Sequence, residues 1–190
     1  SDELLGPMRE AERFAQFPLA LSPAAERIER NVRTAPGPAG APDITLTIYR
    51  PHGAANARPC IYHIHGGGYV GGGASQLEPL HRQASADLDC IIVSVDYRLA
   101  PEHRFPAAIE DCYTGLGWTF ANAAALGVDA SRIGVMGESA GGGLAAALAL
   151  LARDRGEYKL AFQHLIYPMI DDRTCVAAAP NPVAGEFIWT

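Results

Sequence analysis

From residue 60 onward the chain alternates between short apolar runs and longer stretches in which apolar and polar residues recur with a helical period. The apolar runs lie at 60–65, 90–97, 132–137 and 161–170, and the helix-like stretches lie at about 75–88, 106–125 and 140–153. Strands that are apolar without alternation are buried on both faces of a sheet, and helices between them supply the crossovers of parallel strands. The pattern therefore predicts an α/β fold with a mostly parallel central sheet and helices on both faces.

The first part of the chain has a different pattern. Apolar residues recur at helical spacing over 2–16, and a second, more polar helix is expected at about 24–33. The Pro- and Gly-rich segment 35–42 can hold neither a helix nor the hydrogen bonds of a sheet, and an alternating strand follows at 44–49. These patterns divide the chain into an N-terminal arm of helices at 1–34 and a core at 35–190.

Composition and charge narrow the class of protein. With 190 residues, of which 48% are apolar and 19% charged, the chain is typical of one soluble globular domain. A net charge of −6 and scattered Lys and Arg residues disfavour nucleic acid as a partner. The longest nearly polar-free run, Ala140–Ala152, is too short to span a bilayer, which predicts a buried helix and no stable membrane insertion.

The N-terminal sequence mixes charged and apolar residues and lacks the uninterrupted apolar core of a secretory signal. We therefore expect a cytoplasmic location, although a mature chain whose signal had been removed would have the same sequence. The four cysteines lie far apart, with no CxxC or Cys/His spacing, which argues against a metal site or a redox-active pair. We expect reduced, buried thiols at Cys60, Cys90, Cys112 and Cys175.

The strongest chemical signal is Gly137-Glu138-Ser139-Ala140-Gly141, which follows one predicted strand directly and opens the next predicted helix. A serine at such a tight turn projects its hydroxyl above the sheet, and only small neighbours let the chains pass. The helix N-terminus adds unpaired N–H groups and a partial positive charge where an oxyanion would form. The segment predicts Ser139 as a nucleophile; the alternative is a chance match in which Ser139 only caps a helix.

A second glycine motif, His65-Gly66-Gly67-Gly68, follows the first apolar strand of the α/β region. Acyl transfer builds negative charge on a carbonyl oxygen, and the backbone N–H groups of glycines can approach that oxygen closely. The motif is typical of the oxyanion loop of lipases and esterases, where it works with the N–H that follows the nucleophile, here that of Ala140. His65 is interpreted as a hydrogen-bonding residue of the loop rather than as the catalytic base.

The same glycines also fit a different chemical class. The spacing Gly66-x-Gly68-x-x-Gly71 matches a dinucleotide-binding fingerprint, and Asp96 ends the next strand. In that fingerprint the last glycine already lies in a helix, whereas Gly71-Gly72-Gly73 continues a loop. A dinucleotide-binding oxidoreductase is therefore a distant alternative, and it leaves the segment 137–141 unexplained.

Three further segments occur with these motifs: Asp96-Tyr97-Arg98-Leu99-Ala100-Pro101-Glu102-His103, Phe105-Pro106-Ala107-Ala108 and Tyr167-Pro168-Met169. In this combination the chain resembles the hormone-sensitive-lipase family of esterases over nearly its whole length. The resemblance implies an α/β-hydrolase fold and hydrolysis of carboxylic esters without a cofactor.

The resemblance implies, position by position, that Ser139 is the nucleophile and that the N–H groups of Gly67, Gly68 and Ala140 form the oxyanion hole. His65, Glu138 and Glu102 are interpreted as supports of the loop, and an ordinary ion pair is an equal alternative for the two carboxylates; family members often have Asp at position 138. The arm at 1–34 resembles part of the family's cap. Its residues Leu5, Met8, Phe14 and Phe17 suit either a modest pocket for short to medium acyl esters or the packing of an amphipathic helix.

A nucleophilic serine needs a histidine base oriented by an acid, in the chain order serine, acid, histidine. His164 alone follows Ser139, and it falls within a predicted strand, where we expect a packed core histidine. Asp154 and Glu157 lie at the far end of the helix that begins at the serine, about 20 Å away at 1.5 Å per residue. Asp171 and Asp172 are expected to cap a loop.

In the family, the acid and the histidine follow later strands, so we expect both beyond residue 190 and a sheet that lacks its last strands. Two hypotheses follow: an esterase represented by its N-terminal portion, and a shortened homologue that binds acyl ligands without hydrolysing them. A small-molecule ligand is the expected partner in both, and an exposed sheet edge predicts a homo-oligomer.

Overall fold

The computed structural model describes Gly6, Arg9 and the residues 20–53 and 57–171. The helices are α2 (Pro23–Glu26), α3 (Glu78–Asp87), α4 (Ala107–Ala121), α5 (Ala123–Leu126) and α6 (Ala140–Arg155), and the strands are β1 (Glu29–Ala35), β2 (Ile44–Arg50), β3 (Arg58–Ile64), β4 (Ile91–Asp96), β5 (Val128–Glu138) and β6 (Gln163–Ile166). From β3 onward strands and helices alternate along the chain, which confirms the predicted α/β class.

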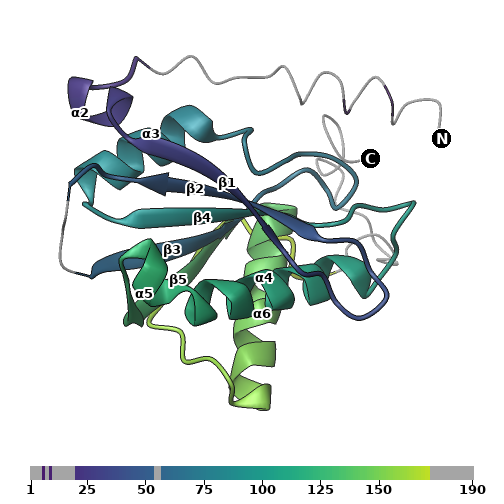
Figure 1. Cartoon of the computed structure of the whole chain (residues 1–190). Coiled ribbons are helices and arrows are strands. Elements are labelled where there is room, and N and C mark those ends of the chain that lie inside the picture. Colours follow the sequence, from purple (N-terminus) through teal and green to yellow (C-terminus); the bar gives the residue numbers. More distant parts are fainter. Residues whose placement is uncertain (1–5, 7–8, 10–19, 54–56, 172–190) are drawn as a thin grey trace.

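Within the described residues the strands form one six-stranded sheet in the order β1-β2-β4-β3-β5-β6 (Figure 1). Strands β4, β3, β5 and β6 run parallel to one another, whereas β2 is antiparallel to both β1 and β4. The sheet is therefore mostly parallel, as predicted. Because parallel strands end at the same edge, the loops that follow β3, β4 and β5 meet above that edge, where ligands bind in open α/β sheets.

Helices cover both faces of the sheet (Figure 1). On one face α3 packs over a small apolar cluster that includes Tyr49, Ile61 and Ile92. On the other face α4 and α6 pack over the larger core, in which Leu116 and Leu148 are fully buried. Three cysteines of the described residues, Cys60, Cys90 and Cys112, are free and buried, as expected; Cys175 lies outside the described residues.

The prediction of a helix at 24–33 is wrong. Helix α2 ends at Glu26, and Glu29–Ala35 form strand β1. The register of β1 runs antiparallel to β2 from Glu29 opposite Arg50 to Ala35 opposite Ile44, and the Pro- and Gly-rich segment is the turn between the two strands. The stabilising hydrogen bonds come from a distant segment, so the local pattern of a mostly exposed edge strand did not predict them.

Strand β6 is shorter than the predicted run 161–170. It ends at Ile166 because Tyr167 has a positive φ of 36° and Pro168 follows. The prediction that His164 is a packed core residue is wrong: its side chain is exposed among the described residues. None of the described helices has the length and apolar content of a membrane span.

Candidate active site

Ser139 lies at the turn between β5 and α6 and has a strained backbone, with φ 53° and ψ −119°. Positive φ is uncommon for any residue with a side chain, and such strain persists only where the surrounding structure holds it. Here the Ser139 N–H donates to the Ile166 carbonyl at 2.9 Å, and the Ser139 carbonyl accepts from Gly143 at 3.1 Å and Met169 at 2.9 Å. The half-buried serine is thus fixed between α6 and the segment after β6.

The Ser139 side chain makes no capping hydrogen bond to the helix that it precedes. The alternative that this serine serves only as a helix cap therefore has no support in the geometry. The first N–H groups of a helix are left without intrahelical partners, and they carry a partial positive charge.

The small residues around Ser139 are required by close backbone packing. A Cβ atom at Gly137 would lie 2.3 Å from the Gly141 carbonyl oxygen, and one at Gly141 would lie 2.0 Å from that of Ile64. Contacts this short do not occur, so any side chain at these positions would displace the turn. The absence of these side chains lets the start of α6 sit directly against the end of β3, where the second glycine motif begins.

The glycine loop after β3 is a tight turn in the left-handed region. Gly67 and Gly68 have φ values of 115° and 60°, and the Gly67 carbonyl accepts from the N–H groups of Val70 and Gly71 at 3.0 and 2.9 Å. Among the described residues, the N–H groups of Gly67 and Gly68 donate no hydrogen bond to the protein. Both glycines are partly exposed, so these donors are open to a ligand.

This loop overturns the dinucleotide alternative. Helix α3 begins only at Glu78, so Gly71 lies in a loop rather than in the helix that a dinucleotide fingerprint requires. The acidic residue at the end of β4, Asp96, accepts a hydrogen bond from the Ala74 N–H at 2.6 Å and so helps to hold the same loop.

Glu138 connects the serine turn to the glycine loop. One carboxylate oxygen accepts from the Gly66 N–H at 2.6 Å, and the other lies 2.9 Å from Nε2 of His63. Burial by itself would raise the pKa of Glu138, but the hydrogen bonds from His63 and Gly66 outweigh it and hold the pKa below its ordinary value. The carboxylate is therefore ionised at neutral pH.

His65 is buried at the start of the loop. Its Nδ1 donates to the Gly66 carbonyl at 2.7 Å, and its ring stacks on Tyr97 at a centroid distance of 4.2 Å. The Tyr97 hydroxyl in turn donates to the His65 carbonyl at 2.8 Å. Burial lowers the pKa of His65, which keeps the imidazole neutral at physiological pH.

Glu102 is exposed and forms a two-point ion pair with Arg9, with both N–O distances at 2.9 Å. The hydrogen bond from Arg9 lowers the pKa of Glu102 to about 2. Arg9 also donates to the carbonyls of Val70 and Ala100 at 2.6 and 2.8 Å. The ion pair and these two hydrogen bonds therefore tie Arg9 to the glycine loop and to the loop after β4.

The other acids considered from the sequence lie elsewhere. Asp154, in the last turn of α6, pairs with the neighbouring Arg153, and Glu157 accepts from the Tyr113 hydroxyl. Both lie at the far end of α6 from Ser139, as predicted. Asp171 ends the described residues, and Leu5, Met8, Phe14, Phe17 and Asp172 lie outside them.

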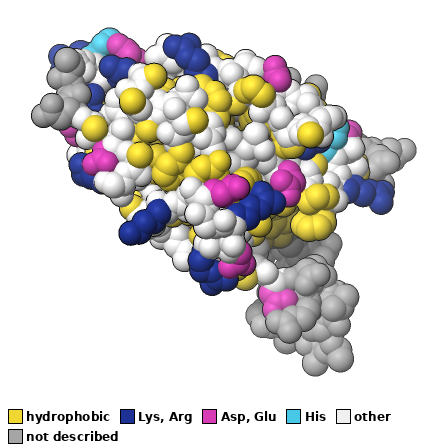
Figure 2. All heavy atoms as spheres, turned by 60° about the horizontal axis from the view of Figure 1, so that its bottom comes forward, with side chains coloured by type: hydrophobic (Ala, Val, Ile, Leu, Met, Phe, Trp, Pro, Cys, Tyr) yellow, Lys and Arg dark blue, Asp and Glu magenta, His cyan; other side chains and the backbone are white. Residues whose placement is uncertain are grey.

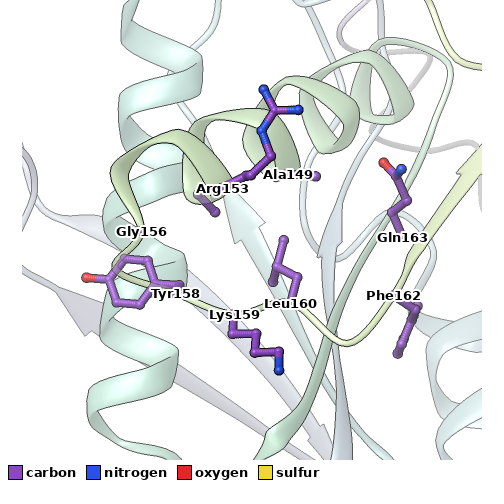
Figure 3. A pocket seen from close by; sticks show the side chains of 9 residues that line it. Ala149, Arg153, Gly156, Tyr158, Lys159, Leu160, Phe162 and Gln163 are labelled. Atoms are coloured by element: carbon purple, nitrogen blue, oxygen red, sulfur yellow. The ribbon is translucent and has the colours of Figure 1, made fainter.

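A hollow of about 480 Å³ lies at that same far end (Figure 3). It is lined by the last turns of α6 and by the segment that leads into β6, including Arg153, Tyr158 and Phe162. Ala149, its nearest lining residue along α6, is ten residues from Ser139, or about 15 Å at 1.5 Å per residue. The hollow is therefore separate from the serine and the glycine loop.

Hydrophobic side chains gather on the side of the molecule that faces down in Figure 1, with charged groups around them (Figure 2). The exposed apolar residues include Leu150 of α6, Phe162 directly before β6 in the sequence, and Tyr167 and Ile170 after it. Such apolar exposure next to an edge strand is unusual for a solvated surface.

Residues 61–190 match the family described as alpha/beta hydrolase fold. The carboxylesterase NlhH of Mycobacterium tuberculosis is 44% identical over 156 residues, which cover 82% of this chain and 48% of that protein. The arylesterase of Saccharolobus solfataricus is 39% identical over 128 residues, covering 67% of this chain and 41% of that protein.

Solved structures agree with these relatives. A bacterial heroin esterase superposes with a TM-score of 0.78 at 38% identity, over 91% of this chain and 51% of that chain. The thermostable carboxylesterase EstE1 superposes with a TM-score of 0.76 at 38% identity, over 90% of this chain and 55% of that chain. This chain thus spans about half the length of the relatives that it matches. By sequence, fold and the geometry around Ser139, it belongs to the α/β-hydrolase fold family, in agreement with its resemblance to the hormone-sensitive-lipase group.

Proposed function

We propose that the protein hydrolyses carboxylic esters of short to medium acyl chain length through an acyl-enzyme on Ser139. The observation that carries this proposal is the strained, half-buried serine at the N-terminus of α6, near a glycine loop in which the N–H groups of Gly67 and Gly68 have no acceptor among the described residues. The names of the relatives, carboxylesterase and arylesterase, support the same reaction class.

In this proposal the Ser139 hydroxyl attacks the ester carbonyl, and the N–H groups of Gly67, Gly68 and Ala140 donate to the oxyanion. The C–O bond to the alcohol then breaks, the alcohol leaves with a proton, and water hydrolyses the acyl-serine to regenerate the hydroxyl. Removal of one preorganised donor of this kind lowers kcat by about 10²- to 10³-fold. Their value depends on being held in place before the charge develops.

The reaction also needs a base and an acid. His63 and His65 are engaged in hydrogen bonds within the sheet and the loop, and His164 lies on β6, two residues before that strand ends. We infer that the histidine and the acid come from the part of the relatives' length that this chain does not span. His65, Glu138 and Glu102 act as supports of the glycine loop, and the part of the segment 1–34 that precedes β1 acts as part of a cap over the acyl pocket.

The test is labelling of the full-length gene product by a fluorophosphonate, which reacts with activated serines. Labelling of wild type that is abolished by Ser139→Ala, but kept by Ser131→Ala at an exposed serine, is the expected result. Labelling at another residue would refute the site. Binding of acyl ligands without labelling or turnover would support the non-catalytic homologue instead.

A further inference from the structure

A row of polar side chains crosses three neighbouring parallel strands beneath α3. Ser94 of β4 and His63 of β3 are register partners, and Glu138 of β5 lies two residues beyond the register partner of His63. Nδ1 of His63 is 2.8 Å from the Ser94 hydroxyl, and Nε2 is 2.9 Å from the Glu138 carboxylate. Ser94 and His63 have no exposed surface, so water does not compete for these bonds.

The hydrogen-bonding capacity of Glu138 fixes one proton position in the row. An ionised Glu138 only accepts, so the His63 nitrogen that faces it must carry the hydrogen. The other ring nitrogen, Nδ1, shares a hydrogen bond with the Ser94 hydroxyl. Every polar atom of the row is satisfied in this arrangement, whereas loss of the imidazole leaves one carboxylate oxygen without its donor in a largely buried place.

His81 of α3 contacts the row in a different way. Its ring meets that of His63 edge-on at a centroid distance of 4.3 Å, and neither of its nitrogens has a hydrogen-bond partner in the described part of the chain. His81 is as deeply buried as His63 but gives the row packing without a hydrogen bond. It therefore offers a matched control.

We infer that His63 is a positioning residue for the glycine loop, an inference that rests on the proposed function. Glu138 directly precedes Ser139, and its other oxygen holds the Gly66 N–H at 2.6 Å. By fixing one carboxylate oxygen, His63 stops the carboxyl group from rotating and so holds Gly66, and with it the N–H groups of Gly67 and Gly68, in a set position relative to Ser139.

A loop of this kind acts on the transition state more than on the bound ester, because the strongest donation occurs when the oxyanion forms. Displacement by about 1 Å can cost on the order of 10²-fold in rate. In the full-length gene product, His63→Phe is expected to lower kcat on an activated acetate ester about 10- to 100-fold, with KM changed less than about threefold. His63→Gln, whose amide can donate to Glu138, should restore much of that loss.

The control is His81→Leu, which removes a buried imidazole of the same cluster but no hydrogen bond of the row. It is expected to keep kcat within about threefold of wild type. Equal losses of kcat in His63→Phe and His81→Leu, or a loss in His63→Gln as large as in His63→Phe, would overturn the inference, since both point to packing alone.

If His63→Phe does not fold, Ser94→Ala continues the test, because it removes the hydroxyl that orients the imidazole at little cost in volume. A several-fold loss of kcat at constant KM is expected, and an unchanged kcat would count against the inference. Ser139→Ala is assayed in parallel. Full turnover by that variant would refute the proposed function, whereas an inactive Ser139→Ala beside a fully active His63→Phe would refute the inference alone.

Discussion

Replacing Ser139 by glycine should make the protein more stable while removing its nucleophile. With φ 53° and ψ −119°, Ser139 lies in a region where strain costs a residue with a Cβ about 1–3 kcal/mol. Glycine does not bear this strain, although its greater freedom in the unfolded chain costs about 0.5–1 kcal/mol. The Ser139→Gly variant should therefore exceed Ser139→Ala in free energy of unfolding by roughly 1 kcal/mol, because alanine retains the Cβ.

The measurement is urea unfolding of both variants in the full-length gene product. Ala147→Gly, at an exposed position within α6, is the control. There the same change from alanine to glycine should lower the free energy of unfolding by about 1 kcal/mol, since glycine has a poor helix propensity. A change of the same sign at both positions would show that the strain at Ser139 is not real.

Four further predictions follow from the site and the sheet. The 190-residue chain by itself should retain only a residual acceleration of about 10³–10⁴ over water on an activated acetate ester, since loss of a triad member costs on the order of 10⁶ in kcat; robust, serine-dependent turnover would contradict this. The complete enzyme should prefer short to medium acyl esters, because a small cap offers little apolar area at about 25 cal/mol per Å²; a preference for long-chain triglycerides in a chain-length series would refute it. Strand β6 pairs on one side only within the described residues, so the isolated chain should dimerise or aggregate as its concentration rises, and a monodisperse monomer in analytical ultracentrifugation would exclude this. The fold lowers the pKa of Glu138, so its ionised carboxylate stabilises the folded protein at a pH above its unfolded pKa of about 4.3, and this stabilisation is lost as the pH falls through the lower folded pKa. The free energy of unfolding, measured between pH 3 and 7, should therefore fall less steeply at acidic pH in Glu138→Gln than in wild type.

The features predicted best from the sequence are those whose cause is local. The turn at Ser139 and the loop at Gly67 depend on glycines within a few residues of each other, since a Cβ at Gly137 would meet Gly141 and one at Gly67 would meet Gly71. The backbone conformation and the residue types that permit it are therefore visible in one short segment. The parallel core was predicted in the same way, because its strands are mostly apolar and show no alternation of apolar and polar residues.

The features missed depend on partners far apart in the chain. Strand β1 is stabilised by its pairing with β2, and Arg9 forms an ion pair with Glu102, which lies 93 residues away in the sequence. No period or motif in the segment around Arg9 indicates such a pairing. Long-range ion pairs and edge strands therefore lie beyond what a local pattern can predict.

His63 lies between these two cases. The apolar runs at 60–65 and 90–97 each contain a polar residue on the same face of the sheet, His63 and Ser94, which the parallel register places side by side. A polar group within a strand buried on both faces must find a hydrogen-bond partner, because leaving it unpaired costs about 1–3 kcal/mol. Two such residues in successive buried strands are a signal of pairing, but we did not predict the pair from the sequence. The carboxylate of Glu138 was assigned to the glycine loop, and its hydrogen bond to His63 became known only from the structure. This hydrogen bond links the core of the sheet to Ser139.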